Sequence, residues 1–195
     1  MLHHEISGNG KKPLVLLHGF MENTTIWDEM ETHLSKDFTL IKIDLPGHGK
    51  SKVYQEIHTV ELMAEKVKEV IDALKLEKIN LLGHSLGGYV SLAFAEKFPE
   101  ILESMTLFFS TTVADDEEKK AIRRRSIAVI DENFETFVKT SIPNLFSNNE
   151  KDILEGKIEL AKNIAKSTNK EGVKAAQLGM AERPDRTEIL ENLDA

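Results

Sequence analysis

Short apolar runs alternate with helical patterns in the first half of the chain. Each run is stopped by a polar residue or a glycine, and the four clearest cover residues 13–17, 38–43, 79–82 and 105–109. Parallel strands covered by helices on both faces are apolar along their whole length, so runs of this kind predict the strands of a mostly parallel sheet. The alternation of strand and helix predicts an α/β fold with right-handed crossovers.

An amphipathic helix is predicted between the second and third runs. Apolar residues recur there at spacings of three and four, which places them on one face of a helix. They are Val60, Met63, Ala64, Val67, Val70, Ile71 and Leu74. Thr59 stands directly before this stripe, where its side chain can cap the helix.

The pattern changes after residue 110. From 115 to 179 the spacing is helical and predicts no strand, and Pro143 is expected to break the helical pattern. Arg123–Arg125 offer a candidate anion site, but we interpret them as a solvated helix face because acidic partners stand upstream in the same helix. We divide the chain into an α/β core at 1–110, a helical cap at 111–180 and a return helix towards the sheet at 181–195.

Composition narrows the class of protein. The 195 residues are 41% hydrophobic and 30% charged, which predicts one soluble globular domain. The absence of cysteine excludes a disulfide scaffold, a thiol nucleophile and a cysteine-based zinc site, and the histidine spacing predicts no other metal site. The 33 acidic residues outnumber the 25 basic ones and are spread along the chain, so we expect no nucleic-acid partner.

The sequence contains no membrane signal. No run approaches the roughly 18 apolar residues that span a bilayer, and Met1–Ile6 lacks the basic segment and the apolar run of a signal peptide. We therefore expect no membrane partner and a cytoplasmic location, with which the lack of cysteine agrees.

The strongest chemical signal is a G-x-S-x-G pattern at residues 83–87. The pattern follows an apolar strand directly and opens a helical segment, so the serine at its centre, Ser85, is expected on a sharp strand-to-helix turn. The small neighbours Gly83 and Gly87 leave room for such a turn. An ordinary glycine-rich turn is the alternative, and two further motifs favour a nucleophile instead.

Those two motifs follow the first and second strands. His18-Gly19-Phe20 comes after the first, and a turn-rich segment, Asp44–Ser51, comes after the second. A nucleophilic serine needs N–H donors aimed at the oxyanion of the tetrahedral intermediate. The backbone N–H of Leu86 is one candidate, and that of Phe20 is the second.

Together with Trp27, these motifs resemble the α/β-hydrolase fold superfamily, in its serine-nucleophile branch with a helical cap, over about residues 13–110. The resemblance implies Ser85 as nucleophile and the amides of Phe20 and Leu86 as oxyanion hole. It also implies a small-molecule carboxylic ester, thioester or similar acyl substrate, and no metal or organic cofactor. An esterase, a thioesterase, a carbon–carbon bond hydrolase and a cofactor-free perhydrolase would share these residues. Serine at this position argues against the dehalogenase and epoxide-hydrolase branches, which use aspartate.

The residues that would activate the serine are missing from their expected places. The resemblance implies the order Ser, then Asp or Glu, then His, yet all seven histidines precede Ser85. We therefore expect the acid and the base beyond residue 195, so that this chain alone is inactive. Weaker candidates, which packing and helix capping explain better, are His18, His48 and His84 as base and Asp115 or Asp116 as acid.

The fourth strand is expected at an edge of the sheet, with unpaired backbone groups. We interpret the chain as the N-terminal part of a longer hydrolase that lacks the C-terminal strands of the fold. A missing C-terminal segment or a self-association partner would then complete the sheet at this edge. The alternative function is a non-catalytic binder of small ligands on the same fold, which a chain without acid and base would suit. The complete serine turn and oxyanion loop argue against a binder.

Overall fold

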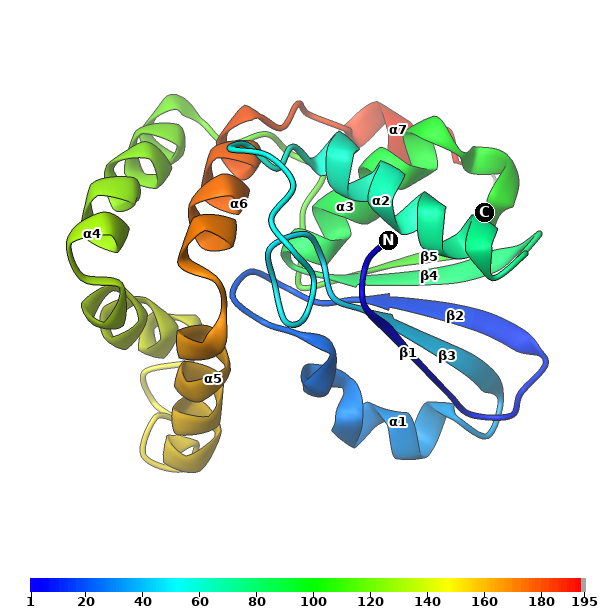
Figure 1. Ribbon diagram of the computed structural model, residues 1–195, viewed down its shortest axis with the longest axis horizontal. Coiled ribbons are helices and arrows are strands. Elements are labelled where there is room, and N and C mark those ends of the chain that lie inside the picture. Colours follow the sequence, from blue (N-terminus) through cyan, green and yellow to red (C-terminus); the bar gives the residue numbers. More distant parts are fainter. Residues whose placement is uncertain (194–195) are drawn as a thin grey trace.

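The computed structural model describes residues 1–193, in which five strands form one sheet in the order β1-β3-β2-β4-β5 (Figure 1). The strands are β1 (His4–Ser7), β2 (Lys12–Leu17), β3 (Phe38–Ile43), β4 (Ile79–His84) and β5 (Leu102–Phe108). β1 pairs antiparallel with β3, and all the other pairs are parallel. The predicted α/β fold with a mostly parallel sheet is confirmed.

Helices cover both faces of this sheet (Figure 1). One face carries the short turn η1 (Thr24–Trp27) and α1 (Asp28–Leu34), and the other carries α2 (Val60–Ala73) and α3 (Leu86–Lys97), which η2 (Pro99–Ile101) connects to β5. Side chains of β2 alternate between the two cores. Leu14 and Leu16 pack with Trp27 on the α1 side, whereas Val15 and Leu17 pack with α2 and α3.

α2 forms as its hydrophobic spacing predicts. The stripe residues from Val60 to Ile71 are all buried. The side chain of Thr59 accepts a hydrogen bond from the N–H of Leu62 at 3.1 Å, which satisfies one of the free donors of the first turn. Leu74 is the C-cap residue, so the stripe and the helix end together.

A helical segment, residues 117–182, packs at the carboxyl ends of the strands (Figure 1). It contains α4 (Glu117–Ser141), η3 (Ile142–Leu145), α5 (Glu155–Ser167) and α6 (Lys170–Glu182). α4 is interrupted at Asn133, and the turn η3 contains Pro143, where a break was predicted. The segment has an apolar cluster of its own, around Phe137 and Val138, which Met21 joins from the loop after β2.

α6 contacts the turn after β3 backbone to backbone. A Cβ on Gly172 would overlap the carbonyl oxygen of Gly47, which itself has φ +75°. Farther along the helix, the N–H of His58 donates to the carbonyl oxygen of Ala175 at 3.0 Å. Only glycine fits at position 172, so α6 is held directly against the core.

The return helix is shorter than expected. α6 continues to Glu182, residues 183–186 are not helical, and α7 covers only Thr187–Glu191. Residues 194–195 of the expected helix lie outside the described residues. Pro184 lies in the link before α7 and disfavours helical backbone at Arg183. The two arginines of the link are buried in long-range ion pairs, Arg183 with Asp115 and Arg186 with Glu61 and Glu96.

The arginine triplet differs in part from the expected solvated face. Arg124 and Arg125 are exposed, but Arg123 is only partly exposed and donates to the carboxylate of Asp115. It also donates to the side-chain oxygen of Gln177, on α6, at 3.1 Å. Arg123 therefore connects α4 to the rest of the structure through partners that helical spacing does not show.

β5 lies at an edge of the sheet formed by residues 1–193, as expected. It begins at Leu102, earlier than the predicted start at 105, and Phe109 leaves the strand with φ +46°. Phe108 and Phe109 are 39% and 81% exposed, so the end of this edge is strongly apolar.

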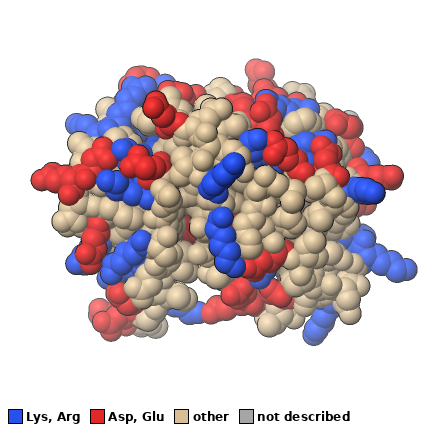
Figure 2. Space-filling model, in the orientation of Figure 1, with Lys and Arg blue, Asp and Glu red and all other residues tan. Residues whose placement is uncertain are grey.

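Charges of both signs are mixed over the surface. On the face shown in Figure 2, acidic and basic side chains are interspersed and form no broad patch of one sign. Within residues 1–193, no helix combines the length and the apolar character needed to cross a membrane.

Candidate active site

Ser85 occupies a sharp turn between β4 and α3. Its backbone has φ +49° and ψ −111°, a conformation that costs an L residue on the order of 1–3 kcal/mol. The N–H of Ser85 donates to Phe108 O at 3.0 Å, while its carbonyl accepts from the N–H of Gly88 and the hydroxyl of Ser110, both at 2.9 Å. The hydroxyl of Ser85 makes no capping hydrogen bond to α3, so the turn does not use this group to stabilise the helix.

The start of α3 rests directly on the end of β2. A Cβ on Gly87 would overlap the carbonyl oxygen of Leu17 and would lie 2.8 Å from that of His18. Only glycine therefore fits at position 87. This close approach puts Leu86, on the first turn of α3, and Phe20, in the loop after β2, on neighbouring stretches of backbone.

His18 sets the direction of the Phe20 N–H. The side chain is fully buried, and its Nε2 accepts the N–H of Leu45 at 2.9 Å. The ring proton is therefore on Nδ1, which donates to the carbonyl oxygen of Gly19 at 2.8 Å. Because the Gly19 carbonyl and the Phe20 N–H belong to one planar trans peptide and point in opposite directions, fixing the first also fixes the second. Burial lowers the pKa of His18, which keeps the ring neutral.

The N–H groups of Phe20 and Leu86 have no hydrogen-bond acceptor within residues 1–193. Leu86 is the first residue of α3, where a helix leaves its N–H groups free and carries a partial positive charge. Two unpaired donors on neighbouring backbone segments, next to the half-buried Ser85, suit an oxygen atom that carries negative charge.

A carboxylate joins the two segments. Glu22 Oε2 accepts the N–H of Gly19 at 2.6 Å and lies 2.9 Å from Nδ1 of His84, the residue before Ser85. His84, for which a packing role was preferred, thus has a polar partner from another loop. The motifs did not indicate Glu22, and its only sequence signal is a carboxylate three positions after Gly19.

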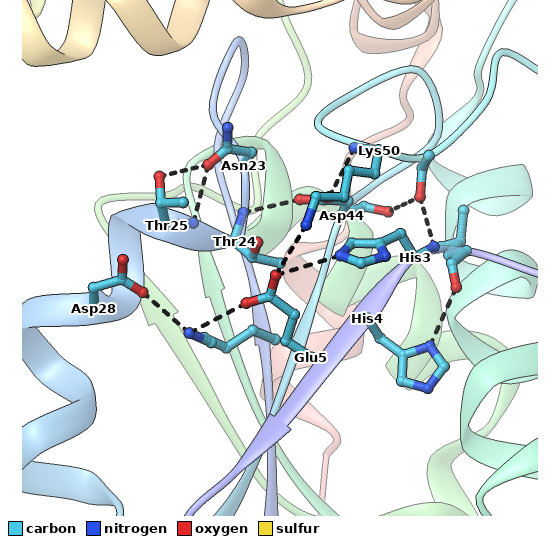
Figure 3. A network of polar contacts seen from close by, with 12 residues as sticks. His3, His4, Glu5, Asn23, Thr24, Thr25, Asp28, Asp44 and Lys50 are labelled. Atoms are coloured by element: carbon cyan, nitrogen blue, oxygen red, sulfur yellow. Dashed lines mark hydrogen bonds and ion pairs between the residues drawn. The ribbon is translucent and has the colours of Figure 1, made fainter.

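Asp44 explains the turn-rich segment after β3 (Figure 3). Its Oδ1 accepts the N–H of Thr24 at 2.9 Å, and its Oδ2 accepts the N–H of Lys50 at the same distance. Its carbonyl oxygen accepts the hydroxyl of Ser51 at 2.7 Å. One aspartate therefore holds both the loop that leads from Phe20 to α1 and the turn that follows β3.

The other buried histidines are weak bases. His48 is fully buried, and burial lowers its pKa to about 3. His58 accepts the N–H of Tyr54 at 3.1 Å through Nε2, and burial lowers its pKa as well. A general base works best with a pKa near the working pH, so neither ring is suited to take a proton from Ser85.

Asp115 and Asp116 have structural roles. Asp116 caps α4 by accepting the N–H of Lys119 at 2.8 Å. Burial opposes the ionisation of Asp115, but hydrogen bonds from Arg183 and Arg123 outweigh it and lower the pKa of the carboxyl. Neither aspartate is paired with a histidine. Among residues 1–193, no three His, Asp or Glu side chains are grouped as a metal site would need.

The family model for the alpha/beta hydrolase fold matches residues 12–152, which include the turn at Ser85 and the loop at His18. The chain belongs to this family. A thermophilic esterase from Thermogutta terrifontis has 36% sequence identity and a TM-score of 0.94, and the match covers 100% of this chain and 72% of that one. The enol-lactonase from Burkholderia xenovorans LB400 shares the fold at 21% identity, with a TM-score of 0.90 over 100% of this chain and 75% of that one.

Curated relatives match over shorter stretches. An uncharacterized protein of Mycobacterium tuberculosis is 33% identical over 111 residues, which are 57% of this chain and 32% of the relative. A serine hydrolase-like protein of Mus musculus is 35% identical over 130 residues, 63% of this chain and 42% of the relative. The chain thus spans about a third to two fifths of the length of these relatives.

Proposed function

We propose that the chain carries the nucleophile and the oxyanion hole of a serine hydrolase that acts on small carboxylic-ester-type acyl substrates. The observation that carries the proposal is the backbone of Ser85, which hydrogen bonds to its N–H and carbonyl groups hold in a costly conformation next to two unpaired N–H donors. Membership of the family and the similarity to the Thermogutta terrifontis esterase support it.

The reaction follows from this arrangement. Oγ of Ser85 attacks the acyl carbon, and its proton passes to a base. The carbonyl oxygen becomes an oxyanion that accepts from the N–H groups of Phe20 and Leu86. The intermediate collapses when the base gives its proton to the leaving alkoxide, and water then hydrolyses the acyl-enzyme and restores the serine. Removing one donor from such a hole costs about 10²–10³ in rate.

The base and its carboxylate partner come from outside residues 1–195 in this proposal. His18 has both ring nitrogens engaged, and the pKa values of His48 and His58 are lowered by burial. The ring of His84 packs against Phe108 and Phe109, and within residues 1–193 no hydrogen bond joins it to the hydroxyl of Ser85. We therefore infer that the isolated chain does not turn over, and that residues beyond it, or a partner at the β5 edge, complete the triad.

The helical segment serves as the cap in this proposal. Met21 is buried in the apolar cluster of that segment, and Phe20 and Phe134 pack against the same cluster. The residue that follows the Phe20 donor is therefore part of the contact with the helices. The cap would supply the apolar wall of the acyl pocket, which suits an acyl group of low polarity.

A fluorophosphonate probe tests the proposal on the chain itself. Intact-mass spectrometry would follow adduct formation with and without added imidazole, a small base that can replace a missing histidine. We expect slow labelling without imidazole and one adduct per chain, at Ser85, with it. Ser85→Ala should abolish the adduct, while Ser147→Ala, which removes an exposed hydroxyl, should leave labelling unchanged.

Each other outcome contradicts part of the proposal. Fast labelling of Ser85 without imidazole would place the base within residues 1–195. A folded chain that is not labelled under either condition would contradict the nucleophile and favour the small-ligand binder. An adduct that survives in Ser85→Ala would assign the reaction to another residue.

A further inference from the structure

The two oxyanion donors stand on different elements, and one side chain links the first of these elements to the end of β4, which leads into the second. Phe20 belongs to the loop after β2, and Leu86 belongs to α3. Glu22 Oε2 accepts the N–H of Gly19 at 2.6 Å and lies 2.9 Å from Nδ1 of His84. The Glu22 and His84 side chains are about three-quarters buried, 25% and 23% exposed, so water competes little for this contact.

The loop that carries Phe20 needs such a link because its conformation is costly. Met21 has φ +58°, which costs a non-glycine residue on the order of 1–3 kcal/mol. The peptide groups of Gly19 are held from two sides: the carbonyl by Nδ1 of His18, and the N–H by Glu22. A hydrogen bond to an ionised carboxylate is roughly twice as strong as one between two neutral groups, so Glu22 holds this loop firmly.

No side chain larger than hydrogen fits at Gly19 in this arrangement. A Cβ there would lie 2.7 Å from Glu22 Oε2 and 2.9 Å from His84 Nδ1. The loop, the carboxylate and the imidazole are therefore in direct contact. A shift of Glu22 would move Gly19, and with it the Phe20 N–H, relative to the serine turn.

On the function proposed above, we propose that Glu22 is a positioning residue that sets the spacing between the Phe20 and Leu86 donors of the oxyanion hole. It does not touch the substrate. Its carboxylate holds the loop against His84, one residue before the nucleophile, so that both donors converge on one oxygen. Fixed donors stabilise the oxyanion because they need no reorganisation when the charge develops.

The test measures how fast the probe reacts with Ser85, since phosphonylation also develops a negative oxygen. The maximal rate constant and the probe affinity would be obtained separately, in imidazole, for Glu22→Ala, Glu22→Asp and Glu22→Gln. Glu56→Ala, which removes an exposed carboxylate, is the matched control. Thermal melting of each variant shows whether it folds.

A positioning role predicts a specific order of rates. Glu22→Ala should lower the maximal rate constant about 10–100-fold, less than the loss of a whole donor, with little change in probe affinity. The side chain in Glu22→Asp is one methylene too short to reach both partners, so its maximal rate constant should be close to that of Glu22→Ala. Glu22→Gln keeps an oxygen acceptor of the same reach and should recover most of the rate. Because Glu22 and His84 act through one contact, Glu22→Ala combined with His84→Ala should be no slower than Glu22→Ala alone.

Two results would overturn the inference, and they differ from failure of the proposed function. Equal maximal rates for Glu22→Ala and the unchanged chain would show that the hole does not depend on Glu22, while Ser85 remains the nucleophile. Equal losses for Glu22→Gln and Glu22→Ala would show that an acceptor oxygen at this position does not restore the rate, which contradicts positioning through these two contacts. If the unchanged chain gives no adduct, the proposed function fails and this inference fails with it. Should Glu22→Ala not fold, the comparison of Glu22→Asp with Glu22→Gln decides.

Discussion

His18 and Leu45 stand just beyond adjacent strands, and a hydrogen bond of 2.9 Å joins the N–H of Leu45 to Nε2 of His18. The bond fixes the tautomer of the ring and so makes Nδ1 the donor to Gly19. The orientation of the loop after β2 therefore depends on the end of β3.

Replacement of His18 tests this dependence. His18→Ala leaves the buried N–H of Leu45 without an acceptor and opens a cavity, so we expect the free energy of unfolding to fall by about 2–5 kcal/mol. Urea titration followed by circular dichroism would measure the change. His33→Ala, at an exposed position of α1, should stay within about 0.5 kcal/mol of the unchanged chain. A loss for His18→Ala as small as that of the control would contradict the bracing role.

Acid should destabilise the protein through its buried histidines. Burial lowers the pKa of His48 to about 3, whereas an unfolded histidine has a pKa of about 6.5. The unfolded chain then binds more protons, so stability is complete above about pH 6.5 and is lost as the pH falls towards 3. At pH 5, the lowered pKa of His48 alone should reduce the free energy of unfolding by about 2 kcal/mol. His18 and His58, whose pKa values are also lowered, act in the same direction.

The measurement is the free energy of unfolding at pH 7.5 and at pH 5, where carboxylates titrate little. His48→Asn removes the titrating group and keeps a side-chain donor for the carbonyl of Pro46, which lies 3.0 Å from Nδ1 of His48. In this variant, the free energy of unfolding should differ between the two pH values by about 2 kcal/mol less than in the unchanged chain. An unchanged difference would show that His48 does not resist protonation in the folded state.

Two glycines offer a matched comparison of crowding. Gly87→Ala forces a Cβ into the carbonyl oxygen of Leu17, so we expect a loss of about 1–3 kcal/mol and slower labelling of Ser85. A Cβ on Gly156, in α5, would meet no atom within 4 Å, and alanine is the better helix former. Gly156→Ala should therefore gain about 0.5–1 kcal/mol. Thermal melting measures both effects. If the two variants shifted the melting temperature in the same direction, this explanation would be contradicted.

Asp115 and Asp116 are neighbours with different expected contributions. Asp115→Ala leaves Arg183, whose side chain is 4% exposed, without its carboxylate, and breaking a buried pair in this way costs about 3–5 kcal/mol. Asp116→Ala removes only a helix cap and should cost about 1 kcal/mol. Urea titration of both variants checks the order. A loss for Asp115→Ala no larger than that for Asp116→Ala would contradict the stabilising role of the buried ion pair.

Local patterns predicted the parts of the fold that local physics determines. The stripe after Thr59, the short apolar strands and the glycines around Ser85 each specify their conformation within a few residues. These features also indicated where the candidate site lies. The family motifs added the donors at Phe20 and Leu86, whose N–H groups have no acceptor within residues 1–193; their role in an oxyanion hole stays a prediction.

Features that depend on distant partners were not predictable in this way. Arg123 was expected on a solvated face because its partner Asp115 stands outside helical spacing, and Gln177 stands on another helix. The segment at 183–186 was expected to be helical, although Pro184 is a local signal against it, and Arg186 pairs with Glu61 on α2 and Glu96 on α3. The role of Glu22 was not predicted for the same reason, because its partner His84 lies 62 positions away in sequence.

The glycine-to-glycine contact between α6 and the turn after β3 has a consequence for motion. Two backbones that touch cannot slide or tilt without breaking the adjoining bond from His58 to Ala175, so α6 moves only together with the core. α4 is joined to α6 near its middle by side chains, Asp131 with Lys174 at 2.7 Å, and carries a break at Asn133, which can serve as a hinge. We therefore expect α6 to move with the core as one body, while the two halves of α4 can bend relative to each other at Asn133.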